Sequence, residues 1–380
     1  MNEVKQRVLL VATVYTHLAN FHKPTIKLLQ DKGFEVHAAA NDNEGRKDEI
    51  EEMGVVCHTI LFSRSPLNMN NILAMKGLSV LFKTNIYKVI HVHTPIAAFI
   101  VRMISSFYKQ GPVLYTAHGF HFHKNAPLIN WLIYYPAEKI AKRWTDGLIV
   151  VNDEDFTMAK KMGYVPNKTL FLTHGVGVNL NLHKQNDESI GNIREELAIP
   201  QEDFVLVCVA EFTKNKNHRF LLQAWQRLLQ VSTDCHLILA GSGKFYSRMK
   251  TYTLQKKINN VHFLGFRHDV QEILKHSDAI TLVSKREGLP KSIMEGMVLG
   301  LPAIVTNIRG SKDLITHEEN GFVVNLGHVD DLTHFMKLLI DNKQIRSKMG
   351  QYSIGKIKTY STTNVIKELE NIYQRFRVIR

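Results

Sequence analysis

Residues 284–302 read SKREGLPKSIMEGMVLGLP and lie between two short apolar segments, Ala279–Val283 and Ala303–Thr306. Both segments have the length of buried strands, and Lys291–Leu299 has the apolar spacing of a helix. A strand, a helix and a second strand in this order predict one unit of a parallel sheet. In such sheets ligands bind beyond the carboxyl ends of the strands. The stretch therefore predicts an α/β fold and makes the loop at residues 284–290 the first candidate for a binding site.

The same alternation of short apolar segments and helical patterns extends over the rest of the chain. Further strands are expected at Val8–Val14, Phe34–Ala40, Val55–Ile60, Val89–Val92, Val113–Ala117, Leu148–Val151, Phe204–Ala210, His236–Ala240, Val261–Leu264 and Phe322–Val324. Further helices are expected near Phe21–Lys32, Ile72–Phe82, Pro95–Tyr108, Leu128–Arg143, His218–Leu229, Lys244–Gln255, Asp330–Ile340 and Asn364–Phe376. The chain therefore predicts two doubly wound, Rossmann-like α/β domains that face each other across a cleft.

The segment Thr173–Pro200 interrupts this alternation. It is rich in Asn, Asp, Gln and Gly, and its only strong apolar pattern is Ile193–Ile199. A chain of 380 residues is also long for a single core, since domains usually have about 50–250 residues. We therefore expect a first domain at residues 1–172 and a second at residues 173–359.

The composition is that of a globular protein, with 44% hydrophobic and 22% charged residues. No apolar run reaches the about 20 residues that a membrane-spanning helix needs. The first apolar run, Val8–Val14, is not followed by a small-residue cleavage site, so no signal peptide is expected. The three cysteines lie far apart in apolar surroundings, which indicates reduced core residues of a cytosolic protein rather than a disulfide or a metal site.

The net charge of +13 indicates an anionic partner. Residues 54–136 contain no Asp or Glu but many basic side chains, namely Arg64, Lys76, Lys83, Lys88, Arg102, Lys109 and Lys124. The same stretch holds the apolar and aromatic segments Ile96–Tyr108 and Ala126–Ala137. Basic residues beside apolar ones favour contact with an anionic membrane surface. The alternative is that these helices face the core and that their lysines are simply solvated.

The loop at residues 284–290 combines two kinds of group. The helix that starts near Lys291 presents unpaired amides and the positive end of its dipole, which is a site for an anion. Glu287 in the loop and Glu295 in the helix are suited to accept hydrogen bonds from hydroxyl groups of a ribose and a hexose. A phosphate site beside carboxylates for sugars is what a nucleotide-sugar binding site requires.

On these residues the chain resembles the large retaining glycosyltransferase family 4, which has the GT-B fold. Glu287 and Glu295, framed by Glu-Gly-x-Pro and by Gly300-x-Pro302, look like the signature of that family. Supporting matches are Thr116–Gly119, Leu239–Gly243, Phe263–Asp269, Thr306–Gly310 and Asn320–Phe322. More narrowly, the chain resembles bacterial exopolysaccharide and capsule transferases of the EpsD type, which add sugars to acceptors linked to polyprenyl diphosphate.

The resemblance implies a role for each matching position. Glu295 would bind the ribose hydroxyls of the donor nucleotide, and Glu287 would contact the donor hexose. His118 would lie near the donor sugar and the reacting carbon, and Lys216 matches a lysine that clamps the diphosphate. The remaining donor-binding positions are Ser284, Gly288, Leu289, Pro290 and Lys291 around the diphosphate and Gly265, Phe266 and Arg267 at the base. It also implies that the C-terminal helix, residues 360–380, joins the first domain.

The chain departs from the family pattern at the diphosphate clamp. The family has Gly-Arg-x4-Lys-Gly, whereas Glu211 stands here at the position of the arginine, and Ala210 and Asn217 replace the glycines. One cation of the clamp is therefore missing. The candidates to supply it are Lys214, His218 and Arg219.

The segment Thr16–Asn20 follows the first strand and is expected to be a loop at the acceptor pocket. It lacks the Gly-Gly pair that is often found there. His17 and Asn20 are its candidates for contact with the acceptor.

No metal site is expected. Asp153-Glu-Asp155 matches the Asp-x-Asp pattern of metal-dependent transferases, but it begins a helix, where acidic residues complement the dipole. His91-x-His93 and His121-x-His123 have the spacing of ligand pairs, but no Cys or carboxylate nearby in the sequence completes either set. We therefore expect transfer without a metal or any other cofactor.

The sequence as a whole predicts a cytosolic retaining glycosyltransferase, peripherally associated with the inner face of the cell membrane. Its donor would be a nucleotide sugar, a UDP-hexose or UDP-N-acetylhexosamine, and its acceptor a saccharide on polyprenyl diphosphate, in exopolysaccharide biosynthesis. Other polysaccharide-synthesis enzymes are candidate partners, and nucleic acid is not, because no recognition motif accompanies the charge. Two alternatives remain: a UDP-sugar epimerase of GT-B fold, and a weakly catalytic partner subunit of a synthase complex. The residues do not identify the donor sugar, the acceptor, the linkage or the oligomeric state.

Overall fold

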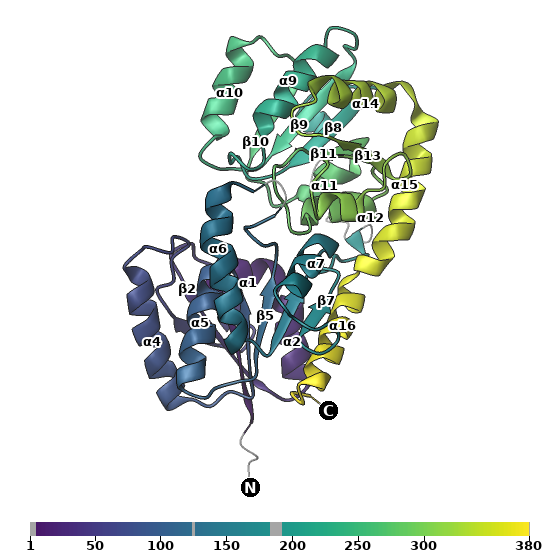
Figure 1. Cartoon of the computed structure of the whole chain (residues 1–380). Helices are drawn as coiled ribbons and strands as arrows, with labels where there is room; N and C mark the ends of the chain where they lie inside the picture. Colours follow the sequence, from purple (N-terminus) through teal and green to yellow (C-terminus); the bar gives the residue numbers. More distant parts are fainter. Residues whose placement is uncertain (1–4, 124–125, 183–191, 380) are drawn as a thin grey trace. The chain divides into compact units, whose positions relative to one another are not determined.

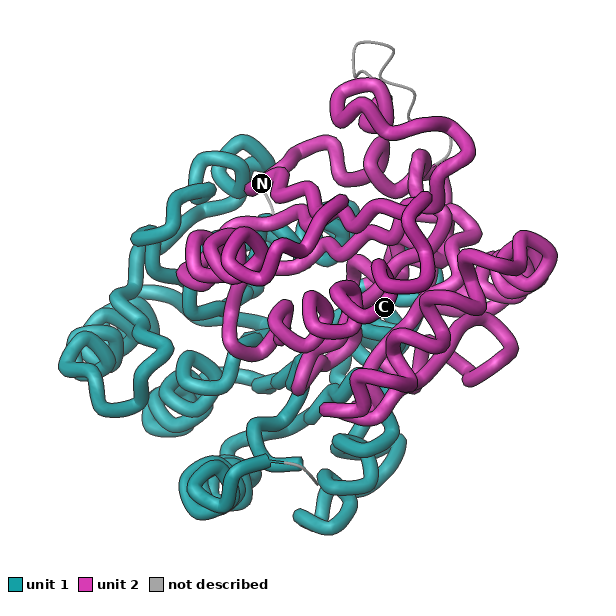
Figure 2. The backbone as a smooth tube through the Cα atoms, turned by 90° about the horizontal axis from the view of Figure 1, so that it is seen from above, with its two compact units in different colours: residues 1–176, 362–380 teal, residues 177–361 magenta. Residues whose placement is uncertain are grey.

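A computed structural model describes residues 5–123, 126–182 and 192–379. The chain forms two compact units (Figures 1 and 2). Unit 1 comprises residues 1–176 and 362–380, and unit 2 comprises residues 177–361. Among the described residues, no helix is both long and apolar enough to span a bilayer.

Unit 1 contains a sheet of parallel strands in the order β3-β2-β1-β4-β5-β6-β7. Its strands are β1 (Arg7–Val14), β2 (Glu35–Asn41), β3 (Val56–Thr59), β4 (Val89–His93), β5 (Val113–Ala117), β6 (Gly147–Val150) and β7 (Leu170–Leu172). The strands are added on one side of β1 and then on the other, so Val8 pairs with both Val36 and Val89. This change in the order of strands is that of a doubly wound sheet. The α/β fold expected from the alternation of apolar segments and helices is thus confirmed.

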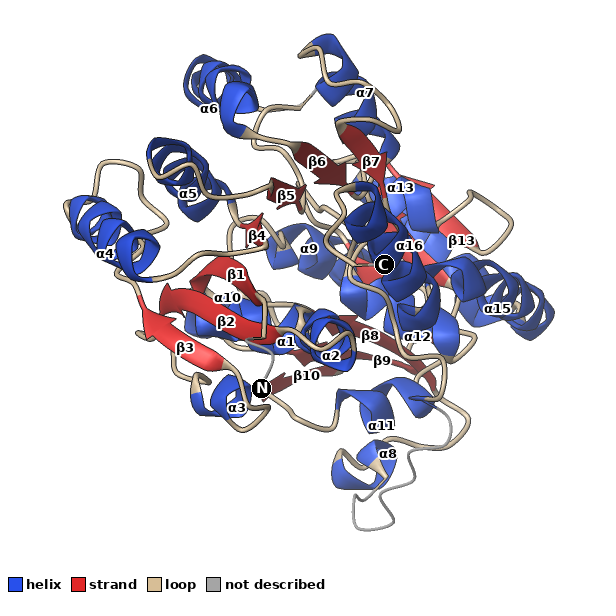
Figure 3. Cartoon of the chain, turned by 90° about the horizontal axis from the view of Figure 1, so that it is seen from below, coloured by secondary structure: helices blue, strands red, loops and turns tan. Residues whose placement is uncertain are grey.

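Helices cover both faces of this sheet (Figure 3). They are α1 (Tyr15–Phe21), α2 (Lys23–Asp31), α3 (Asp48–Glu51), α4 (Asn70–Thr84), α5 (Pro95–Phe107), α6 (Leu128–Ala141), α7 (Asp153–Lys161) and α16 (Thr362–Arg375). Successive side chains of β1 point to opposite faces: Leu9 and Val11 pack with residues of α4 and α5, whereas Val8 and Leu10 pack with residues of α1, α2 and α16. The strands are buried on both faces, which explains their continuous apolar runs.

The expectation of a loop at residues 16–20 is wrong, because these residues form most of α1. Leu18 and Ala19 are buried against the sheet, and the hydroxyl of Tyr15 donates to the carbonyl oxygens of Ala38 and His58. These contacts stabilise a helix that has no side-chain cap. His17 is therefore held on a helix rather than on a loop.

The C-terminal helix α16 packs on α2 and completes unit 1. Val365, Leu369 and Ile372 are buried in the same core as α1 and α2. The hydroxyl of Tyr373 lies 2.7 Å from Nδ1 of His91 in β4, and Glu370 forms an ion pair with Lys32. Two segments that are far apart in the sequence therefore share one core.

Unit 2 contains a second parallel sheet, in the order β10-β9-β8-β11-β12-β13. Its strands are β8 (Phe204–Val209), β9 (Cys235–Ala240), β10 (Val261–Gly265), β11 (Ala279–Leu282), β12 (Ala303–Thr306) and β13 (Gly321–Val324). Its helices are α8 (Ile193–Glu196), α9 (His218–Leu228), α10 (Tyr246–Gln255), α11 (Val270–Lys275), α12 (Lys291–Val298), α13 (Ser311–Leu314), α14 (Val329–Asp341) and α15 (Lys343–Ile357). The strand order again reverses at the first strand of the unit, so each unit repeats the same plan.

Arg102 does not belong to the basic surface expected for residues 54–136. Its side chain is fully buried in α5, where Nη1 and Nη2 donate to the Glu138 carboxylate of α6 at 2.9 and 3.1 Å. The guanidinium also lies 4.3 Å from the centre of the Tyr115 ring. The positive charge of Arg102 thus joins α5 to α6 inside the unit and is not available to a membrane.

We expect Glu138→Gln to destabilise unit 1 by about 3–5 kcal/mol, because it leaves a buried guanidinium without its counter-charge. Urea unfolding, followed through the transition of unit 1, measures this loss. The double variant Arg102→Met, Glu138→Leu removes both charges and should recover most of the stability. The exposed neighbour Lys139→Gln is the control, and equal stability of Glu138→Gln and this control would contradict the prediction.

Candidate functional site

The loop after β11 brings an anionic and a cationic side chain together in unit 2. Nζ of Lys216, from the loop after β8, lies 2.6 Å from Oε1 of Glu287. The two side chains are 23% and 12% exposed, so the pair is partly shielded from water but still reachable. The structure thus brings together two of the residues that the sequence identified as catalytic, from positions 71 residues apart.

Main-chain hydrogen bonds hold these two loops side by side. The amide of Lys285 donates to the carbonyl oxygen of Asn215 at 2.8 Å, and Nδ2 of Asn215 donates to the carbonyl oxygen of Arg286 at 2.9 Å. Asn217 then adopts a left-handed conformation with φ of 58°, which asparagine tolerates better than most residues. The replacement of a family glycine by Asn217 therefore preserves the turn that precedes α9.

A third loop lies against the start of α12. Gly310 has φ of +74°, and a Cβ atom placed there would lie 2.0 Å from the carbonyl oxygen of Gly288. The hydroxyl of Thr306 donates to the carbonyl oxygen of Ser284 at 2.5 Å. The expected diphosphate loop is thus fixed by close backbone contact with the Thr306–Gly310 turn, which only glycine permits.

Glu295 lies in α12, on the turn that follows the N-terminal amides. Its side chain is 19% exposed and 3.7 Å from Nζ of Lys291. Burial raises the pKa of the Glu295 carboxyl, and the Lys291 ammonium opposes this shift. The carboxylate is accessible enough to accept hydrogen bonds from hydroxyl groups.

The turn expected to contact the base presents an exposed aromatic ring, whose edge contact with His268 has ring centroids 4.7 Å apart. Phe266 is 67% exposed, and Gly265 has φ of +70°, which lets the chain turn away from β10. Arg267 is held by Glu196 at 2.7 Å and by Asp269 at 2.6 Å. Phe266 is therefore exposed enough to stack on a planar ring.

Among the candidates for the missing clamp cation, His218 does not fit. It is buried, its ring stacks on Phe212 at 4.0 Å between centroids, and burial lowers its pKa to about 4. Lys214 and Arg219 are exposed and line a cavity of about 780 Å³ with Arg248. Of the three candidates for the clamp cation, Lys214 and Arg219 therefore remain, and His218 does not.

In unit 1, His118 follows β5 and lies among other histidines. Its ring centroid is 5.1 Å from that of His17 and 5.6 Å from that of His22, and its Nε2 lies 3.4 Å from Nδ1 of His93. Burial lowers the pKa of His118 to about 4, so the imidazole is neutral near pH 7. Asn20, the other expected acceptor contact, is exposed, and its side-chain oxygen accepts from Arg46.

His22 and His93 were not among the residues selected from the sequence. His22 follows α1 directly, so the error over α1 concealed its position beside His17. His91 and His93 do share a side of β4, as alternation predicts, with ring centroids 4.4 Å apart. His121 instead stacks on Tyr134.

Asp153-Glu-Asp155 forms the first turn of α7. Asn152 caps this helix by accepting from the amide of Asp155 at 2.8 Å. Oδ2 of Asp155 accepts from the amide of Phe120 at 3.1 Å. The acidic triplet thus complements the helix dipole and supports the loop that carries His118.

Comparisons with known proteins now connect these sites to a family. A family model for glycosyl transferases group 1 matches residues 189–356, and one for glycosyl transferase 4-like proteins matches residues 7–152. The putative glycosyltransferase EpsD of Bacillus subtilis is 33% identical over 98% of this chain and 97% of its own length. The chain belongs to the group 1, family-4-like glycosyltransferases. It is therefore a transferase, as the paired glutamates predicted.

Two further relatives extend the comparison. An Escherichia coli UDP-Gal:alpha-D-GlcNAc-diphosphoundecaprenol alpha-1,3-galactosyltransferase is 25% identical, over 91% of this chain and 89% of its own length. The crystal structure of Anabaena HepE in complex with UDP and glucose has a TM-score of 0.79 at 17% identity, and covers 97% of this chain and 99% of its own. This likeness confirms the GT-B fold.

We expect Gly310→Ala to destabilise unit 2 more than Gly327→Ala. Both glycines have positive φ, so both variants incur about 1 kcal/mol of backbone strain. Only the methyl group at residue 310 would meet a backbone carbonyl, whereas nothing lies within 4 Å of a Cβ at residue 327. The clash should add about 1–3 kcal/mol in urea unfolding. Equal losses in the two variants would show that the contact with Gly288 is not tight.

Proposed function

We propose that this glycosyltransferase moves a hexose or N-acetylhexosamine from a UDP-sugar to a saccharide on polyprenyl diphosphate, with retention of anomeric configuration, in exopolysaccharide synthesis. The Lys216–Glu287 pair beside the start of α12 is the observation that carries this proposal. The name of the Escherichia coli relative, which specifies a UDP-sugar and a diphosphoundecaprenol acceptor, supports the two substrate classes. The complex of HepE with UDP and glucose supports a UDP-linked donor.

Unit 2 would bind the donor. Phe266 would stack on the base, Glu295 would accept hydrogen bonds from the ribose, and the first-turn amides of α12 would meet the diphosphate. Lys216 would neutralise charge on the diphosphate, and Glu287 would accept from a sugar hydroxyl while holding the lysine in place.

Negative charge grows on the diphosphate as the bond to the sugar breaks. A fixed cation at that position lowers the barrier, because it is oriented before the reaction begins. We propose a front-face reaction, in which the leaving diphosphate helps to remove the proton of the acceptor hydroxyl. His118, neutral near pH 7, would donate or accept a hydrogen bond at the donor sugar, and no metal ion would be needed.

Unit 1 would bring the enzyme to its lipid-linked acceptor. Helices α4, α5 and α6 lie in a row (Figure 3), and a cavity of about 360 Å³ is lined by residues from α4, α5 and α6 and from the chain before α4. Large apolar side chains on this side are exposed, namely Leu67, Met69, Ile72, Leu73 and Val80 before and on α4, and Leu128, Ile129, Leu132, Ile133 and Ile140 on α6. Lys76 and Lys83 of α4 and Lys139 of α6 are exposed on the same helices. Apolar and basic groups in one place suit an anionic membrane surface.

Transfer is tested with the purified chain, a panel of UDP-sugars and a polyprenyl-diphosphate saccharide, by measuring UDP release. We expect release from one sugar that depends on the acceptor and persists in excess chelator. Lys216→Met should lower the rate by about 10²–10³, as the loss of a charge-stabilising contact does. Lys337→Met, which removes a lysine paired with Asp341 on the surface of α14, is the control.

Other results of this assay distinguish the alternatives. Conversion of a UDP-sugar without any acceptor would indicate an epimerase. Binding of UDP-sugars without turnover on a broad acceptor panel would indicate a partner subunit, for which the exposed Glu211 at the clamp is the specific observation. Activity that is abolished by chelator and restored by Mg²⁺ or Mn²⁺ would refute metal-independent transfer.

Membrane association is tested by sedimentation with vesicles. We expect the chain to bind vesicles that contain an anionic lipid more tightly than neutral ones, and less at high salt. The double variant Leu128→Ser, Leu132→Ser should weaken binding about tenfold or more, since each lost apolar contact is worth about 1 kcal/mol or more. Leu254→Ser, which removes an equally exposed leucine from unit 2, should bind as the unmodified chain does. Equal binding by all three proteins would contradict a docking role for α6.

A further inference from the structure

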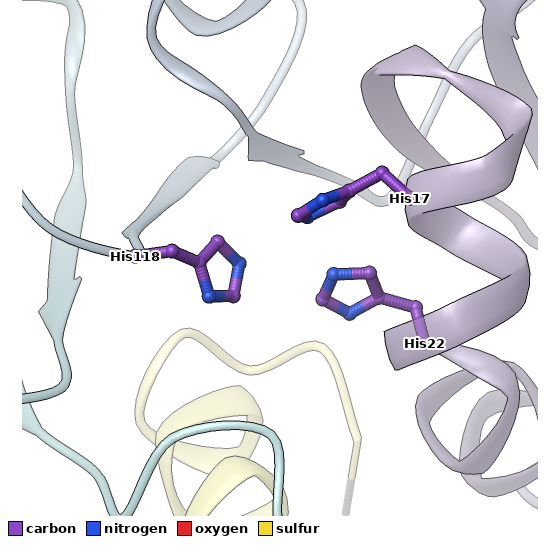
Figure 4. A group of neighbouring side chains, drawn as sticks. All are labelled: His17, His22 and His118. Carbon is purple, nitrogen blue, oxygen red and sulfur yellow. The ribbon is translucent and has the colours of Figure 1, made fainter. Parts of the chain in front are cut away.

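Three histidine side chains of unit 1 converge on one point (Figure 4). His17 lies on α1, His22 directly follows that helix, and His118 follows β5 on the opposite side of the group. Each offers one ring nitrogen, and the three nitrogens lie within 4.8 Å of one another. The separations between ring centroids are 5.1, 5.2 and 5.6 Å.

These separations match a metal-centred arrangement. A zinc ion that binds three imidazoles tetrahedrally, at about 2.0–2.1 Å from each nitrogen, holds the ring centroids about 5 Å apart. Packed rings elsewhere in the chain, such as His236 and His262 at 5.2 Å, reach similar separations, so the state of the ring nitrogens has to be considered as well. A small inward movement of the rings would bring the nitrogens to coordination distance.

One ring nitrogen in each of two of these histidines also has no hydrogen-bond partner among the described residues. Nε2 of His17 and Nε2 of His22 are buried, and neither has a hydrogen-bond partner in the part of the chain that the structure describes. An unpartnered buried nitrogen is unfavourable, and a ligand would compensate for it.

A further histidine and a small cavity, which His17 does not line, adjoin His22 and His118. His93 of β4 stacks on His22 at 3.7 Å between centroids and contacts His118. A cavity of about 20 Å³, lined in part by His22, His93 and His118, lies beside the group. This is about the room that one water molecule needs as a fourth ligand.

We propose that His17, His22 and His118 form a binding site for a zinc ion, with water as the fourth ligand. Imidazole nitrogens suit Zn²⁺ and exclude Mg²⁺ and Ca²⁺, which prefer oxygen ligands. This proposal revises the expectation that the chain has no metal site, but it does not make zinc a requirement for transfer. A zinc ion would instead occupy His118, so it would inhibit transfer; this last consequence rests on the function proposed above.

Metal binding is tested on the full chain without any assay of transfer. We expect one Zn²⁺ per chain in calorimetric titration, no binding of Mg²⁺, and visible absorption of four-coordinate cobalt when Co²⁺ replaces zinc. His17→Gln and His22→Gln should each weaken Zn²⁺ binding about 100-fold, the upper range for loss of a site-defining group. His334→Gln, a change at an exposed histidine of unit 2, should bind as the unmodified chain does.

The outcomes separate clearly. Absence of saturable binding by the unmodified chain, or unchanged affinity in both glutamine variants, would overturn the site. If a variant does not fold, the cobalt spectrum of the unmodified chain still tests the site. Octahedral cobalt would show that the three imidazoles do not bind the ion together. In a transfer assay, zinc should inhibit the unmodified chain and not His22→Gln, each relative to its own zinc-free rate. If the chain shows no transfer at all, the titration and the spectrum still test the site.

Discussion

The direction of the strands is the constraint on which the rest of the molecule depends. All pairings in both sheets are parallel, so within each sheet every strand ends at the same edge. Both faces of each sheet are covered by helices and filled mainly by apolar side chains, and buried polar groups there, such as His91 and Arg102, are paired with other side chains. Most of the candidate site residues therefore lie in the loops beyond the strand ends. His118 after β5 and Glu287 after β11 both occupy such loops.

A binding site made of loops requires contacts that fix the loops relative to one another. In unit 2, the chain achieves this with backbone groups more than with side chains. Gly310 lies directly against Gly288. The amide of Lys285 donates to the carbonyl oxygen of Asn215, whose side chain donates to the carbonyl oxygen of Arg286. The contacts between the loops therefore hold the Lys216–Glu287 pair in position. Preorganisation of this kind allows a charge to stabilise a transition state without first reorienting.

The sequence allowed the sheets to be predicted because buried parallel strands are nearly continuous apolar runs. Val113–Ala117 and Ala303–Thr306 were placed at their observed bounds. The three-residue strand β7 and the helix α15 were not predicted. In α15 the buried face includes Gly350 and Ser353, which have no apolar signal. Helix α1 was taken for a loop because its stability comes from tertiary contacts, such as those of Tyr15, rather than from its own capping.

Some site residues could also be predicted from the sequence, and others could not. Glu287 and Glu295 could be selected because their spacing and framing residues form a local motif. The convergence of His17, His22 and His118 depends on three-dimensional packing, and only the structure shows it. The charge of Arg102 was likewise assigned to the surface because its partner, Glu138, lies 36 residues away and outside the stretch without acidic residues. Sequence patterns identify which chemistry is present, whereas burial determines which of it is accessible.

The position of α16 also has a consequence for how the protein is made. Residues 1–176 of unit 1 are synthesised first, but the core of this unit also includes side chains from residues 362–379. Unit 2 has all its own strands and helices between residues 177 and 361, so during synthesis it is the first unit whose sequence is complete. The core of unit 1 therefore cannot be completed until α16 has been synthesised, whereas the whole sequence of unit 2 is available before that point.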